Sequence, residues 1–471
     1  MQKYKVYCGG EFLESSLTRK VLDKYSGEEI AEVCFADEPM LERAIQKAQQ
    51  VHAELSSLSS FERSGILREI GEKIQKEKER LSRILCQESA KPIFYARAEI
   101  DRAAQTFFVA AEECKRSSGE HVTLDWTAQG KGREGLVKYF PIGIVGGISP
   151  FNFPLNLAVH KIAPAIAAAC PIVLKPSSLT PLSTLELAGF IDSTSLPKGS
   201  VSVLPMDRMT GNRLVTEERV KLLCFTGSPE IGWEMKKQSG KKKVVLELGG
   251  NAGVIISAGT NIRGIIDKCI VGAFSYSGQI CNHAQRFIVH ESLFEEFCTE
   301  MIQAAGQLKK GDPLQEDTRI SSMIDEENAM RAEQWVSEAQ KAGARILCGG
   351  KREGSYYEPT ILTGTNRSMK VYAEEVFGPV ICVEKYAGGI NNAIEALNDT
   401  RFGLQCGVFT DSVKELDAVF RHAEVGGVIH NDVPTLRFDH MPYGGVKDSG
   451  LGREGVKYAI MDMLETKILV K

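Results

Sequence analysis

The stretch GIVGGIS, residues 143–149, opens the part of the chain that decides the fold. It is a short apolar run, and a helical pattern follows it from Pro154 to about Ala169. The alternation continues with PIVLKPS (171–177), a helix from about Pro181 to Phe190, SVSVLP (200–205), a helix near Asn212 and KLLCFTGS (221–228). Such alternation is typical of a parallel sheet covered by helices on both faces.

A second series of the same kind follows KKVVLELGG (242–250). It runs through VIIS (254–257), QRFIVH (285–290), PVICVEKY (379–386), CGVFT (406–410) and GGVIH (426–430). We therefore predict an α/β protein with two doubly wound parallel-sheet domains. The boundary between them is expected near Glu247 to Asn251, where a strand ends in two glycines.

The flanking segments have other patterns. Residues 3–34 alternate strand-like pieces (KYKVYC, EEIAEVC) with glycine turns, which predicts an antiparallel edge, and Met40 to Cys114 is helical. His121 to Ile144 indicates a long hairpin, and Glu465 to Lys471 a short strand without a hairpin partner beside it in the sequence. These two arms favour either strand exchange between subunits or an edge within one chain.

The composition of the 471 residues is that of an ordinary globular protein, with 43% hydrophobic and 25% charged residues. A net charge of −4 shows no excess of basic residues of the kind that binds nucleic acid. The first residues, MQKYKVYCGGEF, contain no apolar leader, and charged residues and prolines interrupt the most apolar window, 153–174, so we expect neither a targeting segment nor a membrane span. Twelve scattered cysteines without a CxxC pair indicate reduced thiols in the cytoplasm and no metal site.

Two segments contain candidate catalytic groups. FSYSGQICNHAQR (274–286) places Cys281 behind a small flexible run, where a thiol is either a buried hydrophobe or a nucleophile at a turn. ISPFNFP (148–154) places Asn152 just before a proline suited to a first helical turn. Its amide either caps that helix or donates to a developing oxyanion.

Two further segments suggest a bound nucleotide. Lys175 ends a predicted parallel strand, where it is either solvated or close to a ribose or phosphate. LLCFTGSPEIG (222–232) has Gly227 and Ser228 before a helix that opens at Pro229, an arrangement that favours anions. The literal GxGxxG of Gly450 to Gly455 follows no apolar strand, and we interpret it as a chance match.

Two carboxylates complete the set. Glu247 lies in an otherwise apolar strand beside a glycine pair, which predicts either a general base with a raised pKa or a salt bridge. EEVFGP (374–379) combines Glu375, suited to a ribose hydroxyl, with Phe377, suited to a flat ring, although turns of this composition are common.

In this order and spacing, the motifs PFNFP, LKPSS, FTGSPEIG, LELGGN, GQIC, EEVFGP and PYGGVKDSGLGREG resemble the aldehyde dehydrogenases. The resemblance is closest to the branch that contains lactaldehyde dehydrogenases and non-phosphorylating glyceraldehyde-3-phosphate dehydrogenases. It implies a dinucleotide-binding domain (1–121 and 141–246), a catalytic domain (247–430), oligomerisation arms (122–140 and 453–471) and a substrate and cofactor loop (431–452). A homodimer or homotetramer is expected.

The resemblance also implies residue roles. Cys281 is similar to the family's nucleophile, Asn152 and the Cys281 backbone N–H to its oxyanion hole, and Glu247 to the base that activates water. Lys175 is expected to take part in catalysis as well as in cofactor binding. The implied cofactor positions are Ser149, Pro150, Phe151, Lys175, Ser177, Ser178, Gly211, Phe225, Thr226, Gly227, Ser228, Glu247, Leu248, Gly249, Glu375 and Phe377.

These roles imply a thiohemiacetal, hydride transfer and hydrolysis of a thioester. An unperturbed thiol is only about 3% thiolate at pH 7, so Cys281 requires a base or a positive environment. Loss of Asn152 is expected to reduce the rate about 100- to 1000-fold. Serine at position 178, where NAD-preferring members often carry glutamate, predicts that NADP is accepted; the cofactor is NADP or NAD.

The implied substrate positions are Arg102, Phe153, Ile280, Asn282 and Arg437. Arg102 and Arg437 match two arginines of the phosphate-using members, while Ile280 and Phe153 replace an arginine and a tyrosine. We therefore expect a small hydroxylated or singly charged aldehyde such as lactaldehyde rather than glyceraldehyde 3-phosphate, although Arg102 is equally suited to a structural ion pair. Alternatives are glyceraldehyde-3-phosphate oxidation, acyl transfer to coenzyme A, which Glu247 disfavours, and a catalytically silent binding protein.

Overall fold

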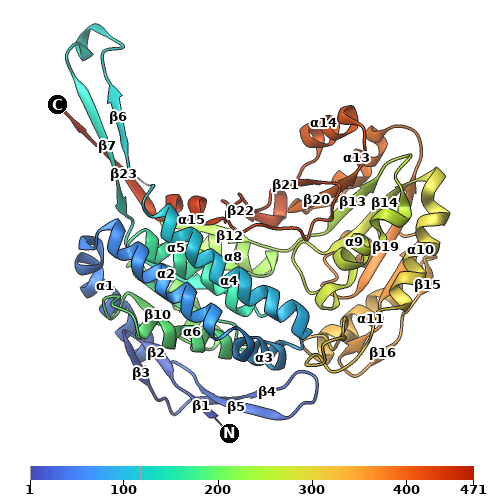
Figure 1. Ribbon diagram of the computed structural model, residues 1–471, viewed down its shortest axis with the longest axis horizontal. Helices are drawn as coiled ribbons and strands as arrows, with labels where there is room; N and C mark the ends of the chain where they lie inside the picture. The colour runs from blue at the N-terminus through green and yellow to red at the C-terminus, as the bar shows by residue number, and fades with distance from the viewer. Residues whose placement is uncertain (1, 117) are drawn as a thin grey trace.

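The computed structural model describes residues 2–116 and 118–471, and two large sheets dominate it (Figure 1). The first sheet has eight strands in the order β22-β12-β11-β8-β9-β10-β2-β3. Its parallel centre contains β8 (Ile144–Ile148), β9 (Ile172–Lys175), β10 (Val201–Val203), β11 (Val220–Thr226) and β12 (Lys243–Glu247). The antiparallel edges are β2 (Val6–Cys8), β3 (Glu11–Leu13) and β22 (Gly450–Leu451).

Helices cover both faces of this sheet, as a parallel sheet requires. They are α1 (Glu38–Ser57), α2 (Ser60–Lys76), α3 (Lys78–Ser89), α4 (Ile93–Glu113), α5 (Pro154–Ala167), α6 (Leu182–Asp192), α7 (Arg208–Thr216), α8 (Pro229–Gln238) and α15 (Val456–Asp462). All fourteen residues of α5 are buried, because α2, α4, α6 and α15 pack around it. A helix without a solvent face must bury its polar side chains, which makes His160 and Lys161 unusual.

The second sheet has seven strands in the order β15-β18-β19-β14-β13-β20-β21, and all except β15 are parallel. They are β13 (Ala252–Ile256), β14 (Ala284–His290), β15 (Arg345–Cys348), β18 (Thr360–Thr363), β19 (Val380–Tyr386), β20 (Gln405–Phe409) and β21 (Gly427–His430). The accompanying helices are α9 (Ile262–Phe274), α10 (Phe294–Gly306), α11 (Glu326–Lys341), α12 (Lys370–Ala373), α13 (Ile390–Asn398) and α14 (Val413–His422). The two predicted series of strands are thus confirmed, and the predicted boundary falls between β12 and β13; β15 and β18 were not predicted.

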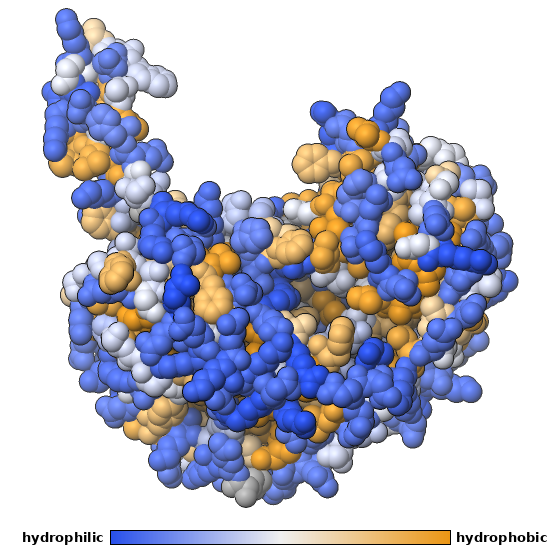
Figure 2. Space-filling model, viewed as in Figure 1, coloured by the Kyte–Doolittle hydropathy of each residue, from blue (hydrophilic) through white to orange (hydrophobic). Residues whose placement is uncertain are grey.

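The arm is a three-stranded sheet that projects from the body (Figure 1). The hairpin of β6 (Glu120–Thr123) and β7 (Glu134–Pro141) pairs with β23 (Leu464–Val470), so the C-terminal strand finds its partner within its own chain. Residues 453–463 do not join the arm, because α15 packs against α5. The surface between the arm and the second sheet is deeply hollowed (Figure 2).

The prediction for residues 3–34 was partly wrong. KYKVYC divides into β1 (Gln2–Tyr4) and β2, which belong to different sheets. β1 pairs in parallel with β5 (Glu29–Cys34), and β4 (Thr18–Leu22) pairs with β5 in the opposite sense. The remaining strands, β16 (Arg352–Glu353) and β17 (Tyr356–Tyr357), form a small hairpin.

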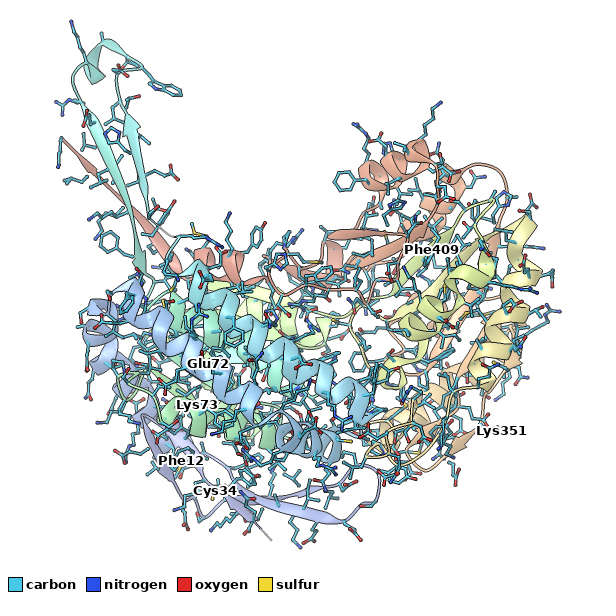
Figure 3. The ribbon with its side chains drawn as sticks, in the orientation of Figure 1. Phe12, Cys34, Glu72, Lys73, Lys351 and Phe409 are labelled. Carbon is cyan, nitrogen blue, oxygen red and sulfur yellow. The ribbon has the colours of Figure 1, made fainter. Side chains whose placement is uncertain are left out.

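The two largest clusters of buried apolar side chains form one core against each large sheet. Phe409, labelled at the end of β20 in Figure 3, belongs to the second core and is 1% exposed. Figure 3 also labels Glu72 and Lys73 on α2, where the Lys73 ammonium pairs with Glu69. No helix in residues 2–116 and 118–471 is long and apolar enough to cross a membrane.

Candidate active site

The loop that presents Cys281 is held in an uncommon backbone conformation. Between α9 and β14, Tyr276 and Ser277 have φ values of 49° and 52°, the left-handed region that non-glycine residues rarely adopt. Both side chains are anchored: the Tyr276 hydroxyl donates to the Ser89 backbone oxygen (3.0 Å) and the Ser277 hydroxyl to the Ser321 backbone oxygen (2.7 Å). Strain of this kind persists only where surrounding contacts enforce it, and it is frequent at functional sites.

Cys281 lies between two cavities. One, of about 220 Å³, is lined by Cys281 together with Arg102, Phe153, Ile280 and other residues. The other, of about 210 Å³, is lined by Cys281 together with Asn152, Glu247 and Glu375. A single thiol therefore faces two binding spaces, one on each side.

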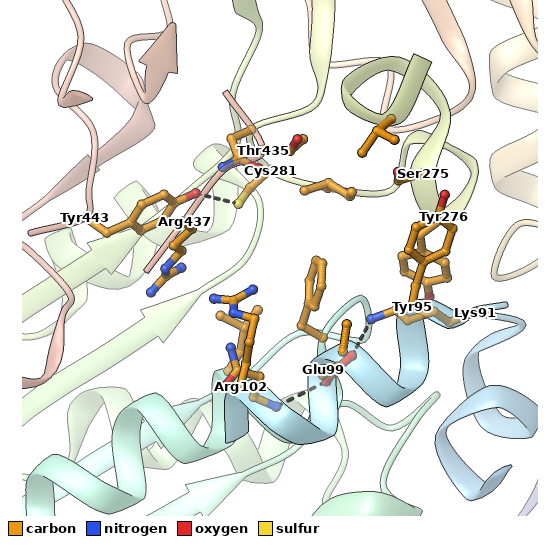
Figure 4. Close-up of a pocket in the computed structure, with 17 residues that line it drawn as sticks. Lys91, Tyr95, Glu99, Arg102, Ser275, Tyr276, Cys281, Thr435, Arg437 and Tyr443 are labelled. Atoms are coloured by element: carbon orange, nitrogen blue, oxygen red, sulfur yellow. Dashed lines mark hydrogen bonds and ion pairs between the residues drawn. The ribbon is translucent and has the colours of Figure 1, made fainter. Parts of the chain in front are cut away.

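The electrostatic surroundings of the thiol act in opposite directions. Burial, followed by the charge of Glu247, raises the pKa of Cys281 well above its ordinary value, while Tyr443 and Arg437 lower it. The Cys281 Sγ lies 3.0 Å from the Tyr443 hydroxyl, joined by a dashed line in Figure 4. The Tyr443 hydroxyl can donate to a thiolate, so it favours the reactive form.

Asn152 is held beside the Cys281 loop and does not cap α5. Its side-chain Nδ2 donates to the backbone oxygen of Gln279 (3.0 Å). The N-cap of α5 is Phe153, without a side-chain hydrogen bond, so the capping interpretation was wrong. The Asn152 amide keeps a second N–H, and the Cys281 backbone N–H donates to no acceptor among the residues that the structure describes.

The cap of α5 comes instead from α4. Glu99 Oε1 accepts from the backbone N–H groups of Leu155 and Asn156, both at 3.1 Å. The other carboxylate oxygen pairs with the Lys91 ammonium, which also donates to the Asn152 backbone oxygen at 2.7 Å. Lys91 and Glu99 are fully buried, and no sequence motif indicated them.

Glu247 ends β12 with a buried carboxylate. Neither of its carboxylate oxygens has a hydrogen-bond partner among residues 2–116 and 118–471, so the salt-bridge interpretation was wrong. Burial, and then the negative charge of Glu454, raise the pKa of Glu247 to about 7. A carboxylate that titrates there is suited to general base catalysis near neutral pH.

A buried network behind Glu247 was not predicted. The Lys161 ammonium donates to Thr226 Oγ1 (2.6 Å) and to Glu454 Oε1 (3.2 Å), and Arg437 Nη2 donates to Glu454 Oε2 (3.0 Å). Both cations lower the pKa of Glu454, which therefore stays charged. Lys161 was visible only as an interruption of an apolar window, and Glu454 lies within the GxGxxG interpreted as a chance match.

The implied cofactor positions fall into three groups. The cavity that contains Glu247 is lined by Pro150, Phe151, Thr226, Gly227, Ser228, Leu248, Gly249, Glu375 and Phe377. A second cavity, of about 600 Å³, is lined by Lys175, Gly211 and Phe225. Ser149, Ser177 and Ser178 line neither; Ser178 donates to the Met206 backbone oxygen (3.4 Å).

These cavities fit a dinucleotide. The first turn of α8 carries no side-chain cap, so its N–H groups are available to an anion. A Cβ on Gly249 would lie 2.3 Å from Glu375 Oε2, so a side chain at this position would displace the Glu375 carboxylate. Burial raises the pKa of Glu375 to about 8, and its Oε1 accepts from the Gly250 N–H (3.0 Å). Lys175 is half-buried, and burial lowers its pKa, so it is not a solvated strand end.

All five implied substrate positions line the cavity of about 220 Å³. Arg102 donates to Asp439 (2.7 Å), whose carboxylate also contacts His160 Nε2 (2.9 Å), so Arg102 is both ion-paired and at the cavity. Arg437 stacks on the Tyr443 ring at 3.7 Å. Figure 4 shows Arg102, Glu99 and Lys91 on the side opposite Cys281 and Tyr443.

Two cavities lie at the strand ends of the first parallel sheet, and a third lies on the other side of Cys281. This arrangement defines an enzyme that binds a nucleotide on one side of a thiol and a small molecule on the other. The chain belongs to the aldehyde dehydrogenase family, whose model matches residues 12–469. It is an oxidoreductase that converts aldehydes to acids with NAD or NADP.

Three relatives cover nearly the whole chain. The 3-sulfolactaldehyde dehydrogenase of Priestia megaterium is 38% identical over 100% of this chain and 98% of its own length. Aldehyde dehydrogenase 21 of Physcomitrella patens, solved with the reaction product succinate, is 44% identical with a TM-score of 0.98, covering 100% and 98%. Glyceraldehyde-3-phosphate dehydrogenase GapN of Methanocaldococcus jannaschii, solved with NADP, is 35% identical with a TM-score of 0.93, covering 97% and 100%. The predicted family, branch and fold are therefore confirmed.

Proposed function

We propose that this enzyme oxidises a short aldehyde whose far end carries one negative charge, with Cys281 as nucleophile. The observation that carries the proposal is the pair of arginines, Arg102 and Arg437, at a cavity of about 220 Å³ that also contains the thiol. The small volume of this cavity favours a short aldehyde. The names of the relatives that act on sulfolactaldehyde or yield succinate support an anionic substrate.

The charge count favours a single negative charge over a phosphate. Each arginine already pairs with a carboxylate, Arg102 with Asp439 and Arg437 with Glu454, so each has only part of its donors free. Ile280 and Phe153 add apolar surface where a phosphate would require donors. Oxidation of glyceraldehyde 3-phosphate is therefore the weaker candidate.

Side chains from several segments of the chain perform the chemistry. The Cys281 thiolate, favoured by the Tyr443 hydroxyl, attacks the aldehyde carbon, and the Asn152 amide and the Cys281 N–H donate to the oxyanion. The bound dinucleotide supplies the hydride acceptor. Glu247 then takes a proton from water, which attacks the Cys281 thioester and releases the acid. Lys161 and Glu454 lie in the polar network behind Glu247, and burial together with the negative charge of Glu454 raises the pKa of Glu247 to about 7.

The test compares anionic and neutral aldehydes by absorbance at 340 nm. Arg437→Met and Arg102→Met are each expected to raise the KM for succinate semialdehyde about 10- to 100-fold while changing the KM for propanal little. Arg97→Met is the matched control, because Arg97 lies on the same helix as Arg102 but pairs with Glu79 and Glu316 at the surface. Equal effects on both aldehydes would disprove the charge assignment.

We further propose that the units divide the work as the resemblance implies, in the cytoplasm. The first sheet binds the dinucleotide, the second supplies Cys281, and the arm joins subunits into a dimer or tetramer. The arm exposes apolar side chains, among them Trp126 (90%), Leu469 (54%) and Ile468 (47%), which supports a covered surface. Ile468→Lys is expected to reduce the mass measured by light scattering, and an unchanged mass would count against this role.

A further inference from the structure

The cavity of about 220 Å³ contains an amide that the chemistry above does not use. Asn156 lines this cavity and is 1% exposed, and neither its Nδ2 nor its Oδ1 has a hydrogen-bond partner among residues 2–116 and 118–471. Leaving a buried amide without partners costs about 1–3 kcal/mol per unsatisfied group. A leucine of similar volume at this position avoids that cost, so the amide requires an explanation.

The backbone fixes where this amide lies. Asn156 is in the first turn of α5, and its N–H donates to Glu99 Oε1 (3.1 Å). Glu99 is in turn held by Lys91, which also binds the Asn152 backbone oxygen. The amide is therefore anchored to the segment that carries the predicted oxyanion donor, and it lies on a fully buried helix rather than on a loop.

The chemistry of the amide selects its partner. A carboxamide offers an acceptor oxygen and a donor NH2 group side by side, and the simplest group that pairs with both is a hydroxyl, which donates to Oδ1 and accepts from Nδ2. A carboxylate only accepts, so it leaves Oδ1 unsatisfied, and the arginines Arg102 and Arg437 already suit a carboxylate or sulfonate.

We propose that Asn156 binds a hydroxyl group on the carbon next to the aldehyde, so that the substrates are 2-hydroxyaldehydes with an anionic far end. The inference rests on the proposed function for the site and the anionic end, and it adds the hydroxyl. A site built around a buried polar group rejects an analogue that lacks the matching group, because the polar group is then left unpaired.

The experiment uses two pairs of aldehydes that differ only in this hydroxyl: 3-hydroxy-4-oxobutanoate against succinate semialdehyde, and lactaldehyde against propanal. For the wild-type enzyme, kcat/KM is expected to be about 10- to 100-fold higher for the hydroxylated member of each pair. Asn156→Leu is expected to bring both ratios close to one. A wild-type ratio near one, or an unchanged ratio in Asn156→Leu, would overturn the proposal.

Two controls separate this role from a structural one. Ser275→Ala removes an unpartnered buried hydroxyl at the same cavity and is expected to keep both ratios; their collapse in this variant would reassign the site to Ser275 and refute the proposal. The Tm of Asn156→Leu is expected to equal or exceed that of the wild type, since the substitution removes an unsatisfied polar group. Any loss of folding in Asn156→Leu is checked with Asn156→Ala, for which the same ratios are expected.

The two pairs also separate this proposal from the proposed function. A preference for neutral over anionic aldehydes would refute the proposal that the substrate has an anionic end. The ratio of kcat/KM between lactaldehyde and propanal would still test the role of Asn156. Conversely, if the enzyme prefers anionic aldehydes but the two members of each pair have equal kcat/KM values, only the role of Asn156 is refuted.

Discussion

The ammonium group of Lys91 donates a 2.7 Å hydrogen bond to the backbone oxygen of Asn152, the residue whose side chain reaches the Cys281 loop. The same ammonium lies 3.7 Å from the centre of the Phe153 ring and 4.5 Å from that of Tyr276, in the loop before Cys281. One buried cation thus contacts both segments that form the proposed oxyanion hole.

Removal of this ion pair is expected to lower kcat for propanal, an aldehyde that has neither the charge nor the hydroxyl group assigned to Arg102, Arg437 and Asn156. The double variant Lys91→Met/Glu99→Gln leaves no unpaired buried charge, and the introduced glutamine side chain retains an oxygen to cap α5. We expect kcat for propanal to fall about 10- to 100-fold with little change in the KM for propanal, because the Asn152 amide loses its fixed position. Stopped-flow absorbance of the first turnover gives the rate.

Glu88 provides the matched control for this variant. It is another buried glutamate, and it accepts from the N–H groups of Leu182 (2.6 Å) and Ser183 (3.0 Å) at the start of α6, without contact to Asn152. Glu88→Gln is expected to keep the first-turnover rate. A double variant with the same rate as Glu88→Gln would contradict the positioning role.

The hydroxyl of Tyr443 is expected to control the ionisation of Cys281. In Tyr443→Phe the thiolate loses a donor, so the thiol pKa should rise further above its ordinary value. The rate of alkylation by iodoacetamide as a function of pH reports that pKa. Glu247→Gln should shift the midpoint downward, because the charge of Glu247 raises the thiol pKa; shifts in the same direction for both variants would refute this account.

Much of this architecture was predictable, because local patterns decide it. The alternation of strands and helices is a consequence of burying both faces of a parallel sheet, and Cys281, Glu247 and Asn152 lie in short motifs near glycine or proline. The N-terminal strands were harder, since β1 and β2 are separated by one residue yet pair with different sheets. Only long-range pairing distinguishes them.

The residues that sequence reasoning missed act across long separations. Glu99 caps a helix that begins 55 residues later, and Glu454 reaches Lys161 from a different part of the chain. A lone glutamate in an amphipathic helix is indistinguishable from a solvated one until its partner is placed. The sequence did show a lysine and a histidine inside an apolar helix. These two residues indicated a buried polar network but did not identify its other members.

The pH dependence of turnover should follow Glu247. A general base works only when deprotonated, and its pKa is raised to about 7, so kcat is expected to increase as the pH rises through 7. Glu247→Gln should lower steady-state kcat about 100- to 10,000-fold and abolish this inflection, while the first turnover still produces reduced dinucleotide. Glu375→Gln, which removes another buried carboxyl group with a raised pKa from the same cavity, should keep the inflection; its loss there instead would reassign the base.

The choice between NADP and NAD is expected to depend on Arg208 and Ser178. Arg208 is exposed, lies at the first position of α7 and lines the cavity of about 600 Å³ with Lys175, so its guanidinium is available to a 2′-phosphate. Arg208→Ala should raise the KM for NADP about 10-fold and change the KM for NAD little, because NAD lacks that phosphate. Ser178→Glu should act in the same direction by repulsion.

The matched control is Arg213→Ala on the same helix, whose guanidinium pairs with Glu38 and Glu42, and it should leave both KM values unchanged. If Arg208→Ala weakens NAD and NADP equally, the arginine contacts a part that the two cofactors share, and it does not explain the predicted acceptance of NADP.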